Sequence, residues 1–142
     1  MRIIAFDLGS KRIGVAVSDL TGTVASPLTV LHRSKSRAHD HRQIAKLVRD
    51  EEAELVVVGL PLSLSGGEGP AAKAARREVA ALSTVVDVPI DMIDERFSTV
   101  TAERALAEGD VRGPARRQRV DMVAAAVFLQ SYLERRRGSN DD

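Results

Sequence analysis

The chain has no cysteine, which excludes a disulfide framework and any zinc site built on thiolates. Aromatic residues make up only 3% of the sequence, so the exposed ring platforms on which single-stranded nucleic acids stack are not expected. No apolar run approaches the ~20 residues of a membrane-spanning helix, and no signal peptide follows Met1. These absences predict a cytoplasmic protein with no membrane partner.

Strong net charge is also missing, because the formal charge is only +1 and no global field draws the chain to nucleic acid. The charges are nevertheless unevenly distributed. Residues 32–42 and 111–119 are basic, whereas 49–54 are acidic. Local patches of this kind decide which partners a surface attracts.

What the chain does have is a length of 142 residues, 44% of them hydrophobic, which suffices for one domain with a core. Short turns separate the first three apolar runs and predict an antiparallel meander. A continuous apolar run at 54–61 predicts a central strand buried on both faces. The expected elements are strands at 3–8, 13–18 and 23–31, a helix at 36–52, strands at 54–61 and 88–94 with a helix at 70–85 between them, a short helix ending near 108, and a last helix at 120–136.

This order predicts an α/β fold with a mixed five-stranded sheet, three antiparallel strands followed by parallel strands, and helices on both faces. Ribonuclease H-like folds have this layout, and so does one lobe of actin-like ATPases. We expect residues 1–136 to form this single domain and residues 137–142 to be a disordered tail. Residues 110–119 are expected to form a basic loop before the last helix.

Carboxylates stand where apolar elements end. Asp7 closes the first strand, Asp94 and Glu95 close the last strand, and Asp121 opens the last helix. A buried carboxylate without a partner costs several kcal/mol, and Mg²⁺ is a partner that prefers such oxygens. These acids could line one two-metal site if the strands that carry Asp7 and Glu95 are adjacent.

Each acid also has an ordinary structural interpretation. Asp7 could bond backbone amides of the turn before Gly9, and Asp121 could favour a helix N-terminus electrostatically. One acid of the pair at 94–95 could form an ion pair with Arg96. The three histidines show no pattern of metal ligands and are expected at the surface, at positions 32, 39 and 41.

Four motifs, which occur in this order, carry a family resemblance: FDLGSKRIGVAVSD (6–19), VVVGLPLSLSGGEGP (56–70), DERFSTVTAER (94–104) and RVDMVAAAVFLQSYL (119–133). Together they closely resemble the YqgF/RuvX family, bacterial proteins with a ribonuclease H-like fold, over about residues 2 to 134. The resemblance implies a metal-dependent nuclease that matures the 5′ end of 16S ribosomal RNA or, by analogy to RuvC resolvases, cleaves Holliday junctions. By position it implies Asp7, Glu95 and Asp121 as catalytic residues and ligands of Mg²⁺ or Mn²⁺, with Asp94 as the competitor of Glu95.

Basic side chains near these acids are candidates for contacts with substrate phosphates, which position nucleic acid without reading its sequence. They are Lys11, Arg12, Arg96, Arg112, Arg116, Arg117 and Arg119. The expected partners are structured nucleic acids, either precursor ribosomal RNA or DNA junctions, and ribosomal particles. The chain is expected to be a monomer or a homodimer, and two opposed cuts in a junction would require the dimer.

Two other classes of function remain open at this point. The first hairpin is similar to the phosphate-binding hairpin of actin-like ATPases and sugar kinases, but such proteins enclose a nucleotide between two lobes and this chain has the length of one. A nucleic-acid-binding chaperone without catalysis is the other alternative, and it would not depend on Asp7.

Overall fold

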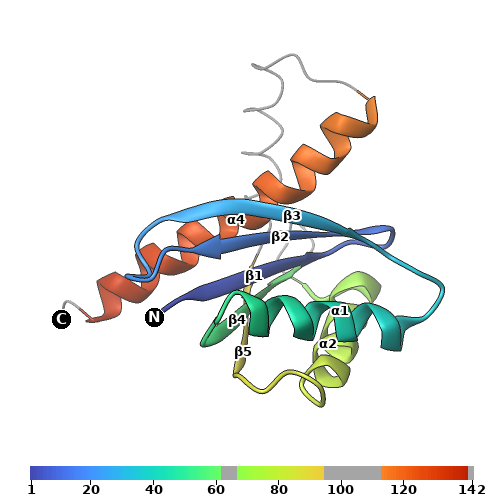
Figure 1. The fold of residues 1–142 in the computed structure, drawn as a ribbon, viewed down its shortest axis with the longest axis horizontal. Helices are drawn as coiled ribbons and strands as arrows, with labels where there is room; N and C mark the ends of the chain where they lie inside the picture. Colours follow the sequence, from blue (N-terminus) through green and yellow to red (C-terminus); the bar gives the residue numbers. More distant parts are fainter. Residues whose placement is uncertain (62–66, 95–112, 141–142) are drawn as a thin grey trace.

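The computed structural model describes residues 1–61, 67–94 and 113–140, with the side chains of the last range given from Met122 to Gly138. A five-stranded sheet has the order β3-β2-β1-β4-β5 (Figure 1). β1 pairs antiparallel with β2, and β2 with β3, whereas β1 with β4 and β4 with β5 are parallel. The mixed sheet predicted from the sequence is therefore confirmed. Its strands are β1 (Ile3–Leu8), β2 (Arg12–Ser18), β3 (Ala25–His32), β4 (Leu55–Leu60) and β5 (Ile90–Asp94).

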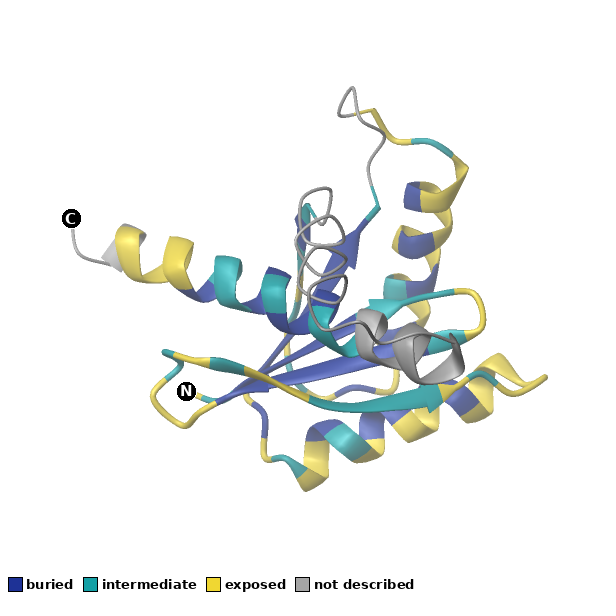
Figure 2. Ribbon diagram, turned by 90° about the horizontal axis from the view of Figure 1, so that it is seen from above, coloured by how far each residue is buried: buried dark blue, intermediate teal, exposed yellow. Residues whose placement is uncertain are grey.

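Helices cover both faces of this sheet, as expected. α1 (Arg37–Asp50) and α2 (Pro70–Leu82) pack on one face, and α4 (Gly113–Asn140) packs on the other (Figure 1). Every residue of β4 is buried between the two layers, and the outer faces of the helices are exposed (Figure 2). The continuous apolar run of β4 thus reflects its central position, where both faces of the strand are covered.

The last helix differs from its predicted bounds. α4 begins at Gly113 and ends at Asn140, whereas a basic loop was expected up to residue 119 and a helix only from 120 to 136. Pro114 is tolerated in a first helical turn, and the alanine, arginines and glutamine that follow it are strong helix formers. The many charges of residues 113–119 were wrongly interpreted as the sign of a loop. Residues 137–140, which were expected in the disordered tail, also belong to the helix.

Polar contacts fix α4 across the sheet. The Gln130 side chain accepts a hydrogen bond from Ala25 N at 2.9 Å and donates to the Thr23 carbonyl at 3.1 Å. The Tyr132 hydroxyl donates to Asp91 on β5 at 2.8 Å. α4 is therefore tied to both edges of the sheet, which fixes the path of the helix that carries Asp121. Within the described ranges, no helix is both long and apolar enough to cross a membrane.

Candidate active site

Asp7 lies near the carboxyl end of β1, on the face of the sheet that α4 covers. Ile3 and Ala5 belong to the buried cluster under α4, whereas Ile4 and Phe6 belong to the cluster under α1 and α2. Because side chains alternate along a strand, Asp7 continues the row of Ile3 and Ala5. It is half-buried and pairs with Gly14 of β2 in the strand register.

The turn after Asp7 is tightly built. Gly9 N donates to the Asp7 carbonyl at 3.0 Å. A Cβ atom on Gly9 would lie 2.5 Å from the Arg12 carbonyl oxygen, so any larger residue would force the backbone apart. Arg33 Nε donates to the Gly9 carbonyl at 2.7 Å, and Arg33 N donates to the Lys11 carbonyl at 2.9 Å. The turn that follows Asp7 therefore has little conformational freedom, which holds the Asp7 backbone in place.

Asp94 lies at the end of β5, on the other face. Ile93 belongs to the cluster under α4, whereas Ile90 and Met92 pack on the side of α1 and α2. Alternation places Asp94 in the row of Met92, away from the face of Asp7. The strands that carry these two acids are also not adjacent, because β4 lies between β1 and β5. The sequence analysis assumed that a shared metal site needs these two strands to be neighbours, and they are not. Two strand spacings put them about 9.5 Å apart.

Asp121 belongs to α4 and lies beyond its first turn. The alternative that Asp121 serves the helix N-terminus therefore loses its basis, because that electrostatic effect fades within the first turn. Its side chain, together with all of Glu95, lies outside the described residues. In the described part of the chain, no three or more His, Asp or Glu side chains are grouped as a metal site would require.

The amino-acid sequence matches a known protein family over nearly the whole chain. The family described as "RuvX: Holliday junction resolvase" matches residues 1–135. The chain belongs to the RuvX family. A relative from Roseiflexus sp. (strain RS-1) is 42% identical over 136 residues, covering 96% of both chains. A relative from Paracoccus denitrificans (strain Pd 1222) is 46% identical over 135 residues, covering 95% of this chain and 85% of the relative. Both relatives carry the name "Putative pre-16S rRNA nuclease".

Solved structures confirm the ribonuclease H-like fold of this RuvX member. Thermus thermophilus RuvC superposes with a TM-score of 0.58 at 16% identity, covering 97% of each chain. RuvC from the same organism in complex with a Holliday junction substrate gives a TM-score of 0.59 at 18% identity, covering 97% of this chain and 96% of that one. The fold predicted from the motifs is thereby established independently of close sequence identity.

The basic residues predicted to contact substrate phosphates in this RuvX member belong to three parts of the chain. Lys11 is exposed in the β1–β2 turn, and Arg12 is half-buried at the start of β2, next to the turn that follows Asp7. Arg96 and Arg112 lie outside the described residues. The first turns of α4 carry the remaining three, Arg116, Arg117 and Arg119, whose side chains are likewise not described.

The sequence analysis missed a buried charge network behind the Asp7 turn. Arg33 binds Glu78 of α2 with two parallel hydrogen bonds of 2.7 and 2.8 Å. His41 Nε2 of α1 lies 2.8 Å from Glu78 Oε2, and it carries the proton because an ionised carboxylate only accepts. Burial alone would raise the pKa of Glu78, but the hydrogen bonds from Arg33 and His41 outweigh burial and lower it. The network joins α1, α2 and the turn after Asp7.

The expectation that His41 is a surface residue was wrong, whereas His32 and His39 are exposed as predicted. A signal for the network was present in the helical spacing. His41 precedes Ile44 and Val48 on the buried face of α1, and Glu78 stands between buried apolar residues of α2. A charged side chain in a buried stripe indicates a partner inside the protein.

A pocket of about 460 Å³ opens beside this network. Its walls come from Asp7 and the turn after it, the end of β4, and α1 and α2, including Ser10, Gly59 and Arg37. The volume falls in the range of small-molecule sites. Arg33 and Glu78 in its wall bind each other, however, so their charges already have a structural use.

Proposed function

We propose that this RuvX family member is a divalent-metal-dependent endonuclease that hydrolyses phosphodiester bonds during 5′-end maturation of 16S ribosomal RNA. The observation that carries the proposal is the position of Asp7, which lies near the end of β1 on the face covered by α4, the helix to which Asp121 belongs. The name shared by relatives of 42% and 46% identity supports ribosomal RNA as the substrate.

The proposed ligands of Mg²⁺ or Mn²⁺ are Asp7, Glu95 and Asp121, an all-carboxylate set suited to hard cations. A pair of such ions supplies Lewis-acid stabilisation of the attacking and the leaving oxygen.

The other residues of the site act on the substrate itself. Exposed Lys11, beside the Asp7 turn, is suited to bind the backbone phosphate next to the cleaved bond. The rigid Gly9 turn fixes the Asp7 backbone, so the carboxylate loses little freedom when substrate binds. Asp7 and Lys11 would together orient the phosphodiester for attack.

The first prediction concerns metal and substrate. Incubated with a precursor of 16S ribosomal RNA, the protein should cut near the mature 5′ end with Mg²⁺ or Mn²⁺, and EDTA should abolish the cut. Gel analysis of end-labelled RNA measures both. Cleavage that persists at full rate in EDTA would contradict the metal assignment.

Holliday junction cleavage is the second candidate function, supported by the RuvC fold. A synthetic four-way junction belongs in the same assay beside the RNA. A resolvase makes two symmetric cuts and should act as a dimer, which light scattering of the protein on its junction would detect. Cutting of the junction alone would replace ribosomal RNA as the proposed substrate.

A second prediction separates the neighbouring acids at the end of β5. Because Asp94 follows the row of Met92, away from the face of Asp7, we propose Glu95 as the ligand. Glu95→Gln should reduce cleavage at saturating substrate by roughly a hundredfold or more, whereas Asp94→Asn should cost less than about tenfold. Single-turnover rates for the two variants measure this, and the reverse ranking would make Asp94 the ligand.

A further inference from the structure

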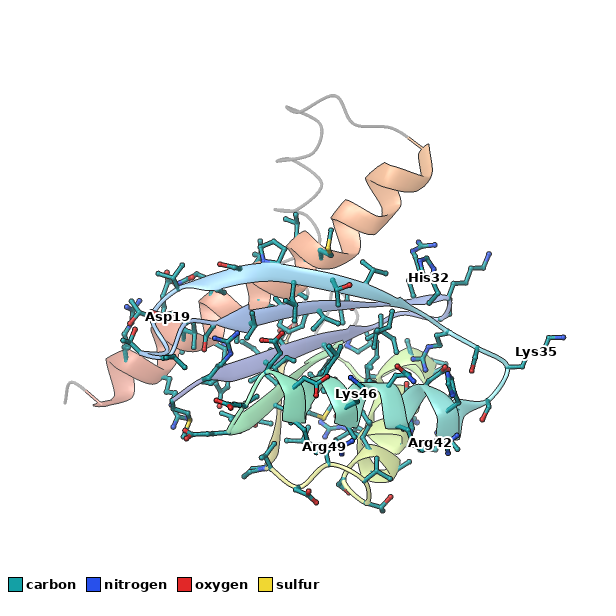
Figure 3. The ribbon with its side chains drawn as sticks, viewed as in Figure 1. Asp19, His32, Lys35, Arg42, Lys46 and Arg49 are labelled. Atoms are coloured by element: carbon teal, nitrogen blue, oxygen red, sulfur yellow. The ribbon has the colours of Figure 1, made fainter. Side chains whose placement is uncertain are left out.

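A basic stripe runs along the outer side of α1 and the loop before it. We name it the α1 stripe, and its members are Lys35, Arg42, Lys46 and Arg49. The spacings of four and three residues put Arg42, Lys46 and Arg49 on one side of the helix, and Lys35 lies in the loop before it (Figure 3). All four are exposed, and the Lys46 side chain is 63% accessible.

Little on this side of the molecule neutralises the α1 stripe. Among the described residues, the ion pair between Lys46 and Asp50 is the only one that a member makes. Asp40, the nearest acid toward the N-terminal end of α1, is buried and accepts hydrogen bonds from Ser34. The other three cations, Lys35, Arg42 and Arg49, are thus left to a ligand outside the chain or to solvent.

The helix sets the length and the limit of the stripe. Its three helical members, Arg42, Lys46 and Arg49, span an α-helical rise of about 10 Å, over which a nucleic-acid duplex carries about six phosphate charges. Beyond Arg49 the surface turns acidic at Asp50, Glu52 and Glu54. The cations therefore form a bounded surface rather than part of a general positive charge, in keeping with a net charge of +1.

The α1 stripe continues from the proposed active site. Arg33 N donates to the Lys11 carbonyl at 2.9 Å, and Arg12 pairs with His32 in the strand register. The chain that leads from His32 into Lys35 thus starts beside the β1–β2 turn (Figure 3). α1 covers the face of the sheet opposite α4, so a ligand that reaches both Asp7 and the stripe must extend around the end of the sheet.

We infer that the α1 stripe binds the backbone phosphates of a double-stranded segment of the substrate, outside the cleaved bond. The inference rests on the proposed nuclease function and deepens it, because it makes a base-paired stem beside the cut part of what the protein recognises. Phosphate contacts from helical cations fit the shape-based recognition of RNA duplexes, whose bases are hard to reach.

The test is the salt dependence of binding to a labelled RNA hairpin, measured by fluorescence anisotropy in EDTA so that binding is separate from cleavage. The variant Arg42→Gln/Lys46→Gln/Arg49→Gln should make the slope of log affinity against log salt shallower by about 2 to 3, because each lost phosphate contact removes roughly 0.9. Glutamine keeps the helix propensity of these positions.

Two controls accompany this variant. Arg135→Gln/Arg136→Gln/Arg137→Gln removes the same charge from the exposed end of α4 and should leave the slope unchanged. Arg42→Lys/Arg49→Lys keeps the charge of the stripe and should retain the wild-type slope. The inference would be overturned if the slope changed equally in both triple variants, or if it did not change in the α1 variant. An acidic protein surface would then be the better partner for the α1 stripe.

The same measurements separate this inference from the proposed function. If the α1 variant loses salt dependence while no RNA is cut under any metal condition, the stripe stands and the nuclease proposal fails. If the wild type cuts precursor RNA and the α1 variant binds the hairpin with an unchanged slope, the nuclease proposal stands and the stripe fails.

Discussion

Asp7→Asn is expected to reduce cleavage by roughly a thousandfold or more, while RNA binding stays the same or becomes slightly tighter. Asparagine keeps the shape of the side chain but removes the negative charge that a divalent cation requires. The electrostatic stabilisation that metal ions supply amounts to several kcal/mol, and each 1.36 kcal/mol is tenfold in rate. Binding is spared because the lost charge repels phosphate. Single-turnover cleavage and anisotropy titration measure the two effects.

Asp19→Asn is a matched control for this variant. Asp19 directly follows β2 of the hairpin whose first strand carries Asp7. Its carboxylate accepts hydrogen bonds from Thr21 Oγ1 at 2.5 Å and Thr23 N at 2.8 Å. The Thr21 hydroxyl and the backbone amides of Thr23 and Val24 lower the pKa of Asp19 to about 2. This acid belongs to its turn, so Asp19→Asn should cleave at the wild-type rate. Wild-type cleavage by Asp7→Asn would show that the site is misassigned.

Much of the fold could be predicted because burial leaves a direct mark on sequence. The apolar run of β4 predicted a central strand, and every residue from Leu55 to Leu60 is buried. The short turns around Gly9 and Gly22 predicted the antiparallel meander, and Gly22 has a φ of 68°, a conformation that glycine adopts at little cost. Local chemistry and strand period agree at these positions, so the prediction was robust.

Other features could not be predicted because they depend on distant partners. Which strands neighbour β1 is decided by how helices cross the sheet, and the insertion of β4 between β1 and β5 has no local signal. The predicted start of α4 was wrong because charge does not distinguish a basic helix from a basic loop. The predicted exposure of His41 was wrong because its partner, Glu78, is 37 residues away in the chain.

Glu78→Ala is expected to lower the free energy of unfolding by about 3–5 kcal/mol, because it leaves the half-buried Arg33 guanidinium without its counter-charge. That is a large part of the roughly 5–15 kcal/mol available to a domain. Urea unfolding followed by circular dichroism measures the change. Since Arg33 also binds the Gly9 carbonyl at 2.7 Å, the loss should loosen the turn that follows Asp7.

The control for this variant is a second glutamate–arginine pair of similar geometry on the surface. Glu68 accepts from Arg76 at 2.6 and 2.9 Å, but both side chains are exposed, at 37% and 52%. Glu68→Ala should therefore cost much less stability than Glu78→Ala. Similar losses in the two variants would mean that burial adds nothing to the Arg33–Glu78 pair.

The effect of pH gives an independent test of the same network. The pKa of Glu78 lies below its ordinary value in the folded protein, because the hydrogen bonds from Arg33 and His41 outweigh the opposing effect of burial. A carboxyl with a lowered pKa contributes stability above its unfolded pKa, near 4.3, and loses it as the pH falls through the folded value. The stability difference between wild type and Glu78→Gln should thus be full at pH 7 and shrink below about pH 4. A difference that stays constant down to pH 3 would mean that the ionised carboxylate is not what joins the two helices to the turn after Asp7.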